Sequence, residues 1–146
     1  IGPDNNNSYL LDGFYSIEDV YIAEDNLKNQ ANTIIYGITG KSTYDKILQV
    51  HNYLIDTISY DSSGADIDMS HTLYGALIKK VAVCDGYAKA FKYILDNLGI
   101  SCVEVCGIAQ NSSGATESHA WNYVKIDEKL RKILTEADIK DGQTAF

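Results

Sequence analysis

Apolar residues recur at intervals of three and four along the first part of the chain, a spacing that predicts amphipathic helices. The first series is Val20, Ala23, Leu27, Ala31 and Ile34, and the second is Ile47, Val50, His51, Leu54 and Ile58. Ser16 and Ser42 precede these series, each with an aspartate three residues later, which is the pattern of a capping box. Gly37 follows the first series. We therefore expect two helices that begin next to Ser16 and Ser42.

A third helical series begins at a cysteine. Its apolar residues are Tyr87, Phe91, Ile94, Leu95 and Leu98. Gly99 follows them, where a left-handed residue would end the helix. Upstream we expect a short helix over residues 73–78, capped by Ser70, and an apolar run over residues 81–83 that leads into Cys84. The pattern thus places Cys84 at a helix N-terminus, where unpaired amides and the helix dipole favour a thiolate and can hold an oxyanion.

The period changes to two after Ser101, which predicts strands over residues 102–108 and 116–126. A polar segment with a glycine, residues 111–114, separates them. On the second strand His119 and Trp121 share one face, and Asn122 points to the other. Helices followed by antiparallel strands predict an α+β fold.

Composition narrows the class of protein further. The chain has 146 residues, 45% hydrophobic and 22% charged, which suits one domain over residues 16–146 behind a loosely held arm, residues 1–15. The net charge of −8 argues against nucleic acid or an anionic membrane as the main partner. No apolar run approaches the roughly 20 residues of a membrane span, and the first residues do not resemble a signal peptide. We expect an intracellular protein or one whose leader is not included in this sequence.

The three cysteines do not suggest a disulfide scaffold, since their number is odd. Cys102 and Cys106 would lie about 13 Å apart along one strand face, too far for a disulfide between them. They also lack a second ligand pair for zinc. We expect both to be buried or half-buried structural thiols, and we predict no metal or cofactor.

Two segments carry a family resemblance: residues 83–88, VCDGYA, and residues 119–122, HAWN. Together with residues 44–61 and 73–77, they resemble the bacterial transglutaminase-like domain, a papain-like group of cysteine enzymes. The resemblance covers roughly residues 42–127. It implies that the helix bearing Cys84 packs on the antiparallel sheet bearing His119, and that these two residues are the catalytic pair.

The resemblance implies a cysteine-dependent acyl transfer on peptide or amide bonds through a thioester. Attack of water on the thioester would make the enzyme a peptidase or amidase, and attack of a lysine amine would make it a crosslinking enzyme. Hydrolysis is favoured, because bacterial members resemble proteases more often and no acidic loop has the ligand spacing of a calcium site. The implied partner is a protein or peptide substrate, with cell-wall peptide as one option, and the implied location is the cell surface or outside the cell.

One part of the family pattern is absent, the aspartate motif on the strand after the histidine. If residues 127–128 form a two-residue hairpin turn, pairing places His119 opposite Glu136 and leaves Leu134 at the aspartate position. Glu136 and Asp138 are then the candidate third carboxylates. The domain could be truncated, divergent or completed by a partner, and the sequence does not decide among these.

Two other interpretations stay open. The chain could be a transglutaminase-like binding or scaffold module without activity, as the absent aspartate motif suggests. Cys84 could also be a redox-sensing thiol, although no cysteine stands at an obvious resolving position. We expect His51 and His71 to be structural or capping residues, and the oligomeric state is not predicted.

Overall fold

The computed structural model describes residue 14, residues 16–63 and residues 68–133. Its helices are α1 (Ile17–Tyr36), α2 (Thr43–Thr57), the 3-10 helix η1 (Asp68–His71), the π-helix η2 (Gly75–Lys79) and α3 (Cys84–Asn97). Its strands are β1 (Ser59–Tyr60), β2 (Val81–Ala82), β3 (Cys102–Gln110), β4 (Thr116–Ile126) and β5 (Lys129–Ile133). None of the described helices is both long and apolar enough to cross a membrane. The expected arm, residues 1–15, lies outside the described residues except for residue 14.

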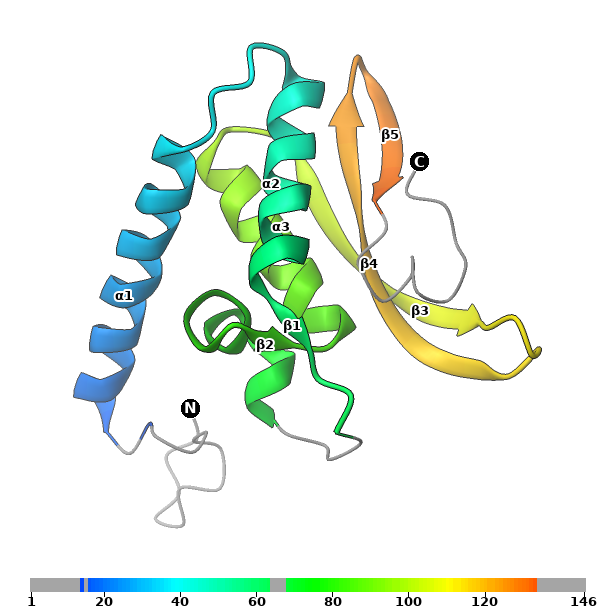
Figure 1. Ribbon diagram of the computed structural model, residues 1–146, viewed down its shortest axis with the longest axis horizontal. Coiled ribbons are helices and arrows are strands. Elements are labelled where there is room, and N and C mark those ends of the chain that lie inside the picture. Colours follow the sequence, from blue (N-terminus) through cyan, green and yellow to red (C-terminus); the bar gives the residue numbers. More distant parts are fainter. Residues whose placement is uncertain (1–13, 15, 64–67, 134–146) are drawn as a thin grey trace.

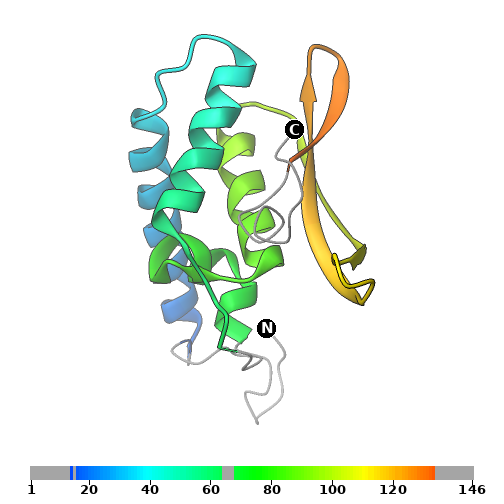
Figure 2. The same cartoon turned by 45° about the vertical axis from the view of Figure 1, so that its right-hand side comes forward.

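The helices and the larger sheet form two layers (Figures 1 and 2). The sheet is antiparallel with the order β3-β4-β5, and β1 pairs with β2 in a separate parallel pair. Helix α3 lies between the sheet on one side and α1 and α2 on the other (Figure 2). This is the predicted α+β fold, with the helix that starts at Cys84 packed on the antiparallel sheet.

Both predicted capping boxes are present. The hydroxyl of Ser16 accepts from the Asp19 amide at 3.2 Å, and the hydroxyl of Ser42 accepts from the Asp45 amide at 3.0 Å. In each box the aspartate side chain also accepts from the serine amide. These bonds satisfy amides that have no partner within the helix, so each helix begins at a defined residue.

Helix α3 is the centre of the core. Seven of its residues are buried, and they are Gly86, Tyr87, Ala88, Ala90, Phe91, Ile94 and Leu95. The Tyr87 hydroxyl donates to the Ile58 carbonyl at the end of α2, so the one polar group of this ring is satisfied. Gly99 has a φ of +71°, which confirms the left-handed stop.

The segment before Cys84 matches the prediction in part. Residues 73–79 are helical, as expected for residues 73–78, with residues 75–79 forming the π-helix η2, and the separate 3-10 helix η1 precedes them. The Ser70 hydroxyl donates to Asp61 at 2.6 Å, and it is the Thr72 hydroxyl that accepts from the Gly75 amide at 2.9 Å. The predicted cap was wrong because a distant carboxylate binds the serine side chain.

The two hairpins largely match the prediction, although β3 extends two residues further, to Gln110. Asp127 and Glu128 have φ of 50° and 62°, as a two-residue turn requires, and Ile126 pairs with Lys129. The described pairing ends at Asn122 and Ile133. The three predicted positions beyond it, Leu134, Glu136 and Asp138, lie outside the described residues.

Candidate active site

Cys84 is the first residue of α3 and is half-buried. The preceding residue, Val83, has extended backbone angles and no side chain that could cap the helix. The amides of the first helical turn have no intrahelical acceptor, and their positive ends point out of the helix. A thiolate at Cys84, or an oxyanion formed beside it, is therefore favoured by the positive end of the helix, and of the first-turn amides the one of Gly86 donates to the Asp85 side chain.

The backbone before Cys84 is held by two other segments, β1 and η1. Residues 81 and 82 of β2 pair in parallel with residues 59 and 60 of β1, and the Val83 amide donates to the Ser70 carbonyl at 3.0 Å. A side chain at Gly86 would place its Cβ 2.4 Å from that same carbonyl oxygen and 2.8 Å from the Cβ of Ala82. Close packing of η1 on the first turn of α3 thus requires glycine at this position.

Two side chains connect α3 to the sheet. The Asn122 amide on β4 donates to the Ala88 carbonyl at 3.0 Å, and Asn122 is 1% exposed. One helical turn later the Lys92 ammonium donates to the Cys102 carbonyl at 3.0 Å, and Cys102 pairs with Val124 of β4. Moving from residue 88 to residue 92 on the helix thus corresponds to moving from residue 122 to residue 124 on β4.

This correspondence locates Cys84 relative to β4. Four helical residues rise about 6 Å, and two strand residues advance about 6.6 Å, so helix and strand stay in step over short distances. When this correspondence is extended one helical turn back from Ala88, it predicts that Cys84 lies level with Ala120, the neighbour of His119. The two candidate residues are therefore at the same end of the α3 and β4 layers.

His119 lies on the other face of β4 from the residues that contact the helices. The buried residues of this strand are Ala120, Asn122, Val124 and Ile126. His119 and Trp121 are half-buried on the opposite face, with ring centroids 6.0 Å apart and planes at 28°. The pairing of Cys84 with His119 stays a prediction.

Trp121 packs closely beside His119. A Cβ at Gly107 would lie 2.7 Å from the indole ring, so this glycine makes room for it on β3. The Lys132 ammonium lies 5.0 Å from the ring centroid, and the indole nitrogen is buried with no hydrogen-bond partner among the described residues. The indole therefore limits how far the His119 ring can turn along this face.

A polar cluster beside the cysteine was not predicted. Asp85 Oδ1 lies 2.8 Å from His71 Nδ1, and Asp85 Oδ2 lies 3.1 Å from Lys89 Nζ. Lys89 also donates to the His71 carbonyl at 2.7 Å. The four-residue spacing of Asp85 and Lys89 is a signal that sequence analysis could have used, but nothing local connects them to His71.

A second polar group lies next to this cluster. Asp61 accepts hydrogen bonds from the side chains of Ser63 and Ser70, which hold the pKa of its carboxyl below the usual value. His71 adds a smaller effect in the same direction. The residues around the start of α3 are therefore charged and hydrogen-bonded on the η1 side.

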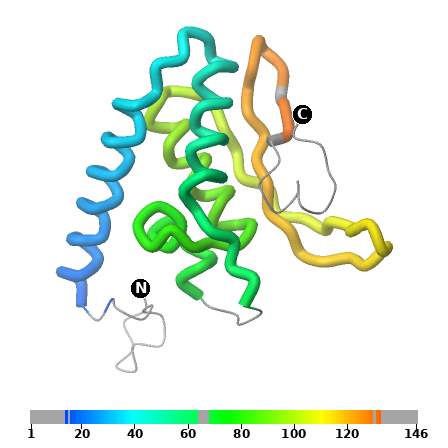
Figure 3. Tube along the Cα trace, viewed as in Figure 1, coloured from blue at the N-terminus to red at the C-terminus, as the bar shows by residue number. Residues whose placement is uncertain are grey.

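The other two thiols differ from each other. Cys102 is buried, and burial raises its pKa to about 12, so it is the expected structural thiol. Cys106 is exposed, so the prediction of burial was wrong for this residue. Figure 3 shows the β3–β4 hairpin turning away from the helices towards its tip, so side chains there are covered less than at the start of β3. All three cysteines are free.

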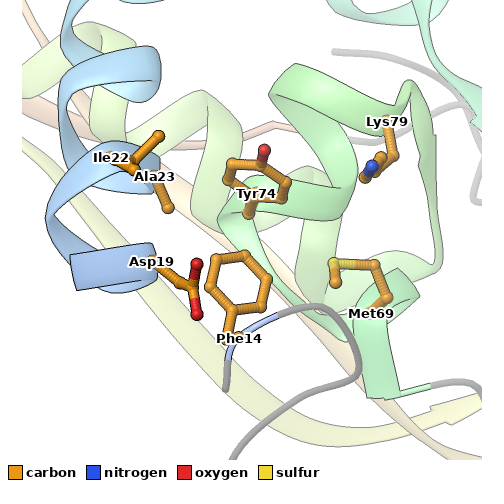
Figure 4. A pocket seen from close by; sticks show the side chains of 7 residues that line it. All are labelled: Phe14, Asp19, Ile22, Ala23, Met69, Tyr74 and Lys79. Atoms are coloured by element: carbon orange, nitrogen blue, oxygen red, sulfur yellow. The ribbon is translucent and has the colours of Figure 1, made fainter. Parts of the chain in front are cut away.

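Two further features bear on ligands. Among the described residues no cluster of histidine, cysteine, aspartate and glutamate side chains could hold a metal ion. A cavity of about 140 Å³ lies between α1 and the η1 and η2 segment (Figure 4). Its lining residues are Phe14, Asp19, Ile22, Ala23, Met69, Tyr74 and Lys79. Neither Cys84 nor His119 contributes to it.

Comparison with known proteins identifies a family. The model of the transglutaminase-like superfamily matches residues 30–130, a segment that contains Cys84 and His119. No sequence among the curated proteins matches the chain.

Two solved structures share the fold. The crystal structure of a TGase matches 88% of this chain with a TM-score of 0.67 and 20% sequence identity. A proposed cysteine protease from Cytophaga hutchinsonii matches 74% of the chain with a TM-score of 0.58 and 17% identity. The chain covers only 35% and 36% of these two structures. At such identities the likeness establishes the fold, and activity has to be argued from the site.

Proposed function

Because the chain belongs to the transglutaminase-like superfamily, we propose that it is a cysteine-dependent acyl-transfer enzyme with Cys84 as nucleophile and His119 as its base. The observation that carries the proposal is the correspondence between positions along α3 and positions along β4. From the bonds of Asn122 and Lys92 we infer that the first residue of the helix is level with the neighbour of the histidine, which supports the proposal. A cysteine nucleophile is activated by a helix terminus and by an imidazole base.

The proposed reaction has two steps. The Cys84 thiolate attacks the carbonyl carbon of an amide, and the oxyanion faces the amides at the start of α3. The tetrahedral intermediate collapses when His119 gives its proton to the leaving amine, which leaves a thioester on Cys84. His119 then takes a proton from water, the hydroxide adds to the thioester, and a carboxylic acid and the free thiol are released.

Water is the acceptor that we favour, which makes the enzyme a peptidase or amidase acting on a protein or peptide. An amine acceptor would give crosslinking by the same first step. Cell-wall peptide at the cell surface or outside the cell is one option for the substrate. Glu136 and Asp138 remain the candidates for a carboxylate that orients His119.

The first test is the pH dependence of iodoacetamide alkylation, with the modified cysteines located by mass spectrometry. The chain supplies its own control, because Cys106 is an exposed thiol on a strand and Cys102 is buried. We expect Cys84 to be alkylated at lower pH than Cys106. The substitution His119→Ala should make the pH dependence of Cys84 alkylation more like that of Cys106. The second test is release of the amine from peptide amides, which Cys84→Ala should abolish.

The absence of the family's aspartate motif from the sequence supports one alternative, a binding or scaffold module without activity. The alkylation measurement distinguishes the enzyme from the module. A Cys84 thiol that alkylates no faster than Cys106 near neutral pH, and that ignores His119→Ala, would exclude the enzyme and favour the module. Reaction that depends on His119 would exclude the module.

A further inference from the structure

The cluster of His71, Asp85 and Lys89 stands on one side of the nucleophile. Asp85 follows Cys84 directly in α3, and successive helix residues are turned by about 100° around the axis. Ala88, one turn after Cys84, faces β4 through its bond to Asn122, so Cys84 lies on the sheet side of the helix. Asp85 and Lys89 lie a quarter turn away, on the side where η1 packs.

The carboxylate of Asp85 is held by several donors. An ionised carboxylate can only accept hydrogen bonds, so His71 Nδ1 carries the hydrogen in its 2.8 Å contact. Lys89 donates to the second oxygen at 3.1 Å, and the Gly86 amide donates to the first at 3.0 Å. The Asp85 side chain is 22% exposed, which limits the screening of its charge by water.

A negative charge next to Cys84 opposes ionisation of the thiol, whereas the helix terminus favours it. We propose that His71 and Lys89 are positioning residues of the nucleophile, because by donating to Asp85 they offset the negative charge beside the Cys84 thiol. This inference rests on the proposed function and extends it, since it assigns a role to a histidine that does not act as the base.

Other charged groups near the start of α3 do not replace this arrangement. Asp61 is engaged by Ser63 and Ser70. The Lys80 ammonium donates to the Tyr53 hydroxyl on α2. His119 on β4 is the other titratable group of the proposed catalytic pair, and its effect is measured separately by His119→Ala.

The test uses the sign of the change in the pH midpoint of Cys84 alkylation. Asp85→Asn removes the negative charge, so the midpoint should fall by roughly 0.5 to 1 pH unit, a threefold to tenfold faster reaction below it. His71→Ala and Lys89→Met each leave the charge less compensated, so the midpoint should rise by a similar amount. Structural damage alone would not separate the three variants by sign.

The same helix offers a matched control. Lys92 and Asp96 form a second ion pair with four-residue spacing at 2.7 Å, about two turns further from Cys84. Asp96→Asn should leave the midpoint unchanged. His71→Gln, which keeps an N–H donor, should restore part of the wild-type value.

A double variant tests whether His71 acts through Asp85. In the Asp85→Asn background, adding His71→Ala should have no further effect on the midpoint. The inference would be overturned by unchanged midpoints in all single variants, or by an effect of His71→Ala that is the same with and without Asp85. If the alkylation of Cys84 still depended on His119 in that case, the proposed function would stand. Thermal unfolding of each variant identifies any that fail to fold, and Lys89→Met then provides the test without the His71 side chain being changed.

Discussion

Asn122 on β4 donates a hydrogen bond from its side-chain amide to the backbone carbonyl of Ala88 on α3, over 3.0 Å. The asparagine is 1% exposed, so both groups are paired away from water. The bond lies one helical turn from Cys84 and three strand residues from His119. It is therefore the closest described tie between the helix and the strand that carry the proposed catalytic pair.

Asn122→Ala should destabilise the protein and reduce the reactivity of Cys84. The change leaves the Ala88 carbonyl without this donor and opens a gap, a loss of about 1 to 3 kcal/mol in the free energy of unfolding. Urea unfolding and alkylation of Cys84 measure the two effects. Asn97→Ala is the control, because Asn97 donates to the Tyr93 carbonyl on an exposed part of the same helix. It should change stability by less than about 0.5 kcal/mol.

Gly86→Ala should also be destabilising, although alanine favours helices more than glycine does. The new Cβ would stand 2.4 Å from the Ser70 carbonyl oxygen, which is fixed by its bond from the Val83 amide. The strain of such overpacking costs about 1 to 3 kcal/mol and should shift the first turn of α3, so Cys84 alkylation changes as well.

The control for this substitution is Gly99→Ala at the other end of α3. Gly99 has a φ of +71°, and no atom lies within 4 Å of an added Cβ. The substitution therefore adds local backbone strain of about 1 kcal/mol without a clash. Its Cys84 alkylation should match the wild type. If Gly86→Ala proved as stable as the wild type, the close packing of η1 on α3 would not be a constraint.

The buried thiol of Cys102 should make stability depend on pH in the alkaline range. Its pKa is raised from 9.0 to about 12 by burial, so between these values the folded protein holds a proton that the unfolded chain releases. The free energy of unfolding therefore falls as pH rises through this range, by roughly 1 kcal/mol at pH 10 once solvent screening is allowed for.

Urea unfolding of wild type and Cys102→Ala at pH 8 and pH 10 measures this contribution. The stability advantage of the wild type should shrink by that amount at the higher pH, because alanine does not titrate. Two curves that stay parallel would show that the folded thiol ionises as readily as the unfolded one. Cys102 should also resist iodoacetamide at pH 8 until the protein unfolds.

Local patterns in the sequence were enough where the partners are close in the chain. Ser16 and Ser42 bind amides three residues away, so their capping boxes could be read directly. Residues 127–128 form the predicted turn, and the register of β4 with β5 follows from it. The opposite faces of Asn122 and Trp121 follow from strand alternation alone.

Predictions failed where a distant group competed for the same side chain or where two layers diverge. Ser70 looked like a helix cap, but Asp61 binds its hydroxyl from nine residues away. Cys106 had the strand position of a buried or half-buried thiol, yet it is exposed, in a sheet whose β3–β4 hairpin turns away from the helices towards its tip (Figure 3). Neither the path of a neighbouring layer nor the choice between two acceptors is written in a local pattern.

The sequence by itself determined where α1, α2, β3 and β4 begin, that Cys84 starts a helix, and which residues share a face with His119. These properties depend on backbone hydrogen bonds and side-chain periodicity over a few residues. Only the tertiary structure decided that Asn122 binds the Ala88 carbonyl, and that His71 donates to Asp85. Those contacts arise when separate elements are packed into one core, because packing fixes which polar groups are brought within hydrogen-bonding distance.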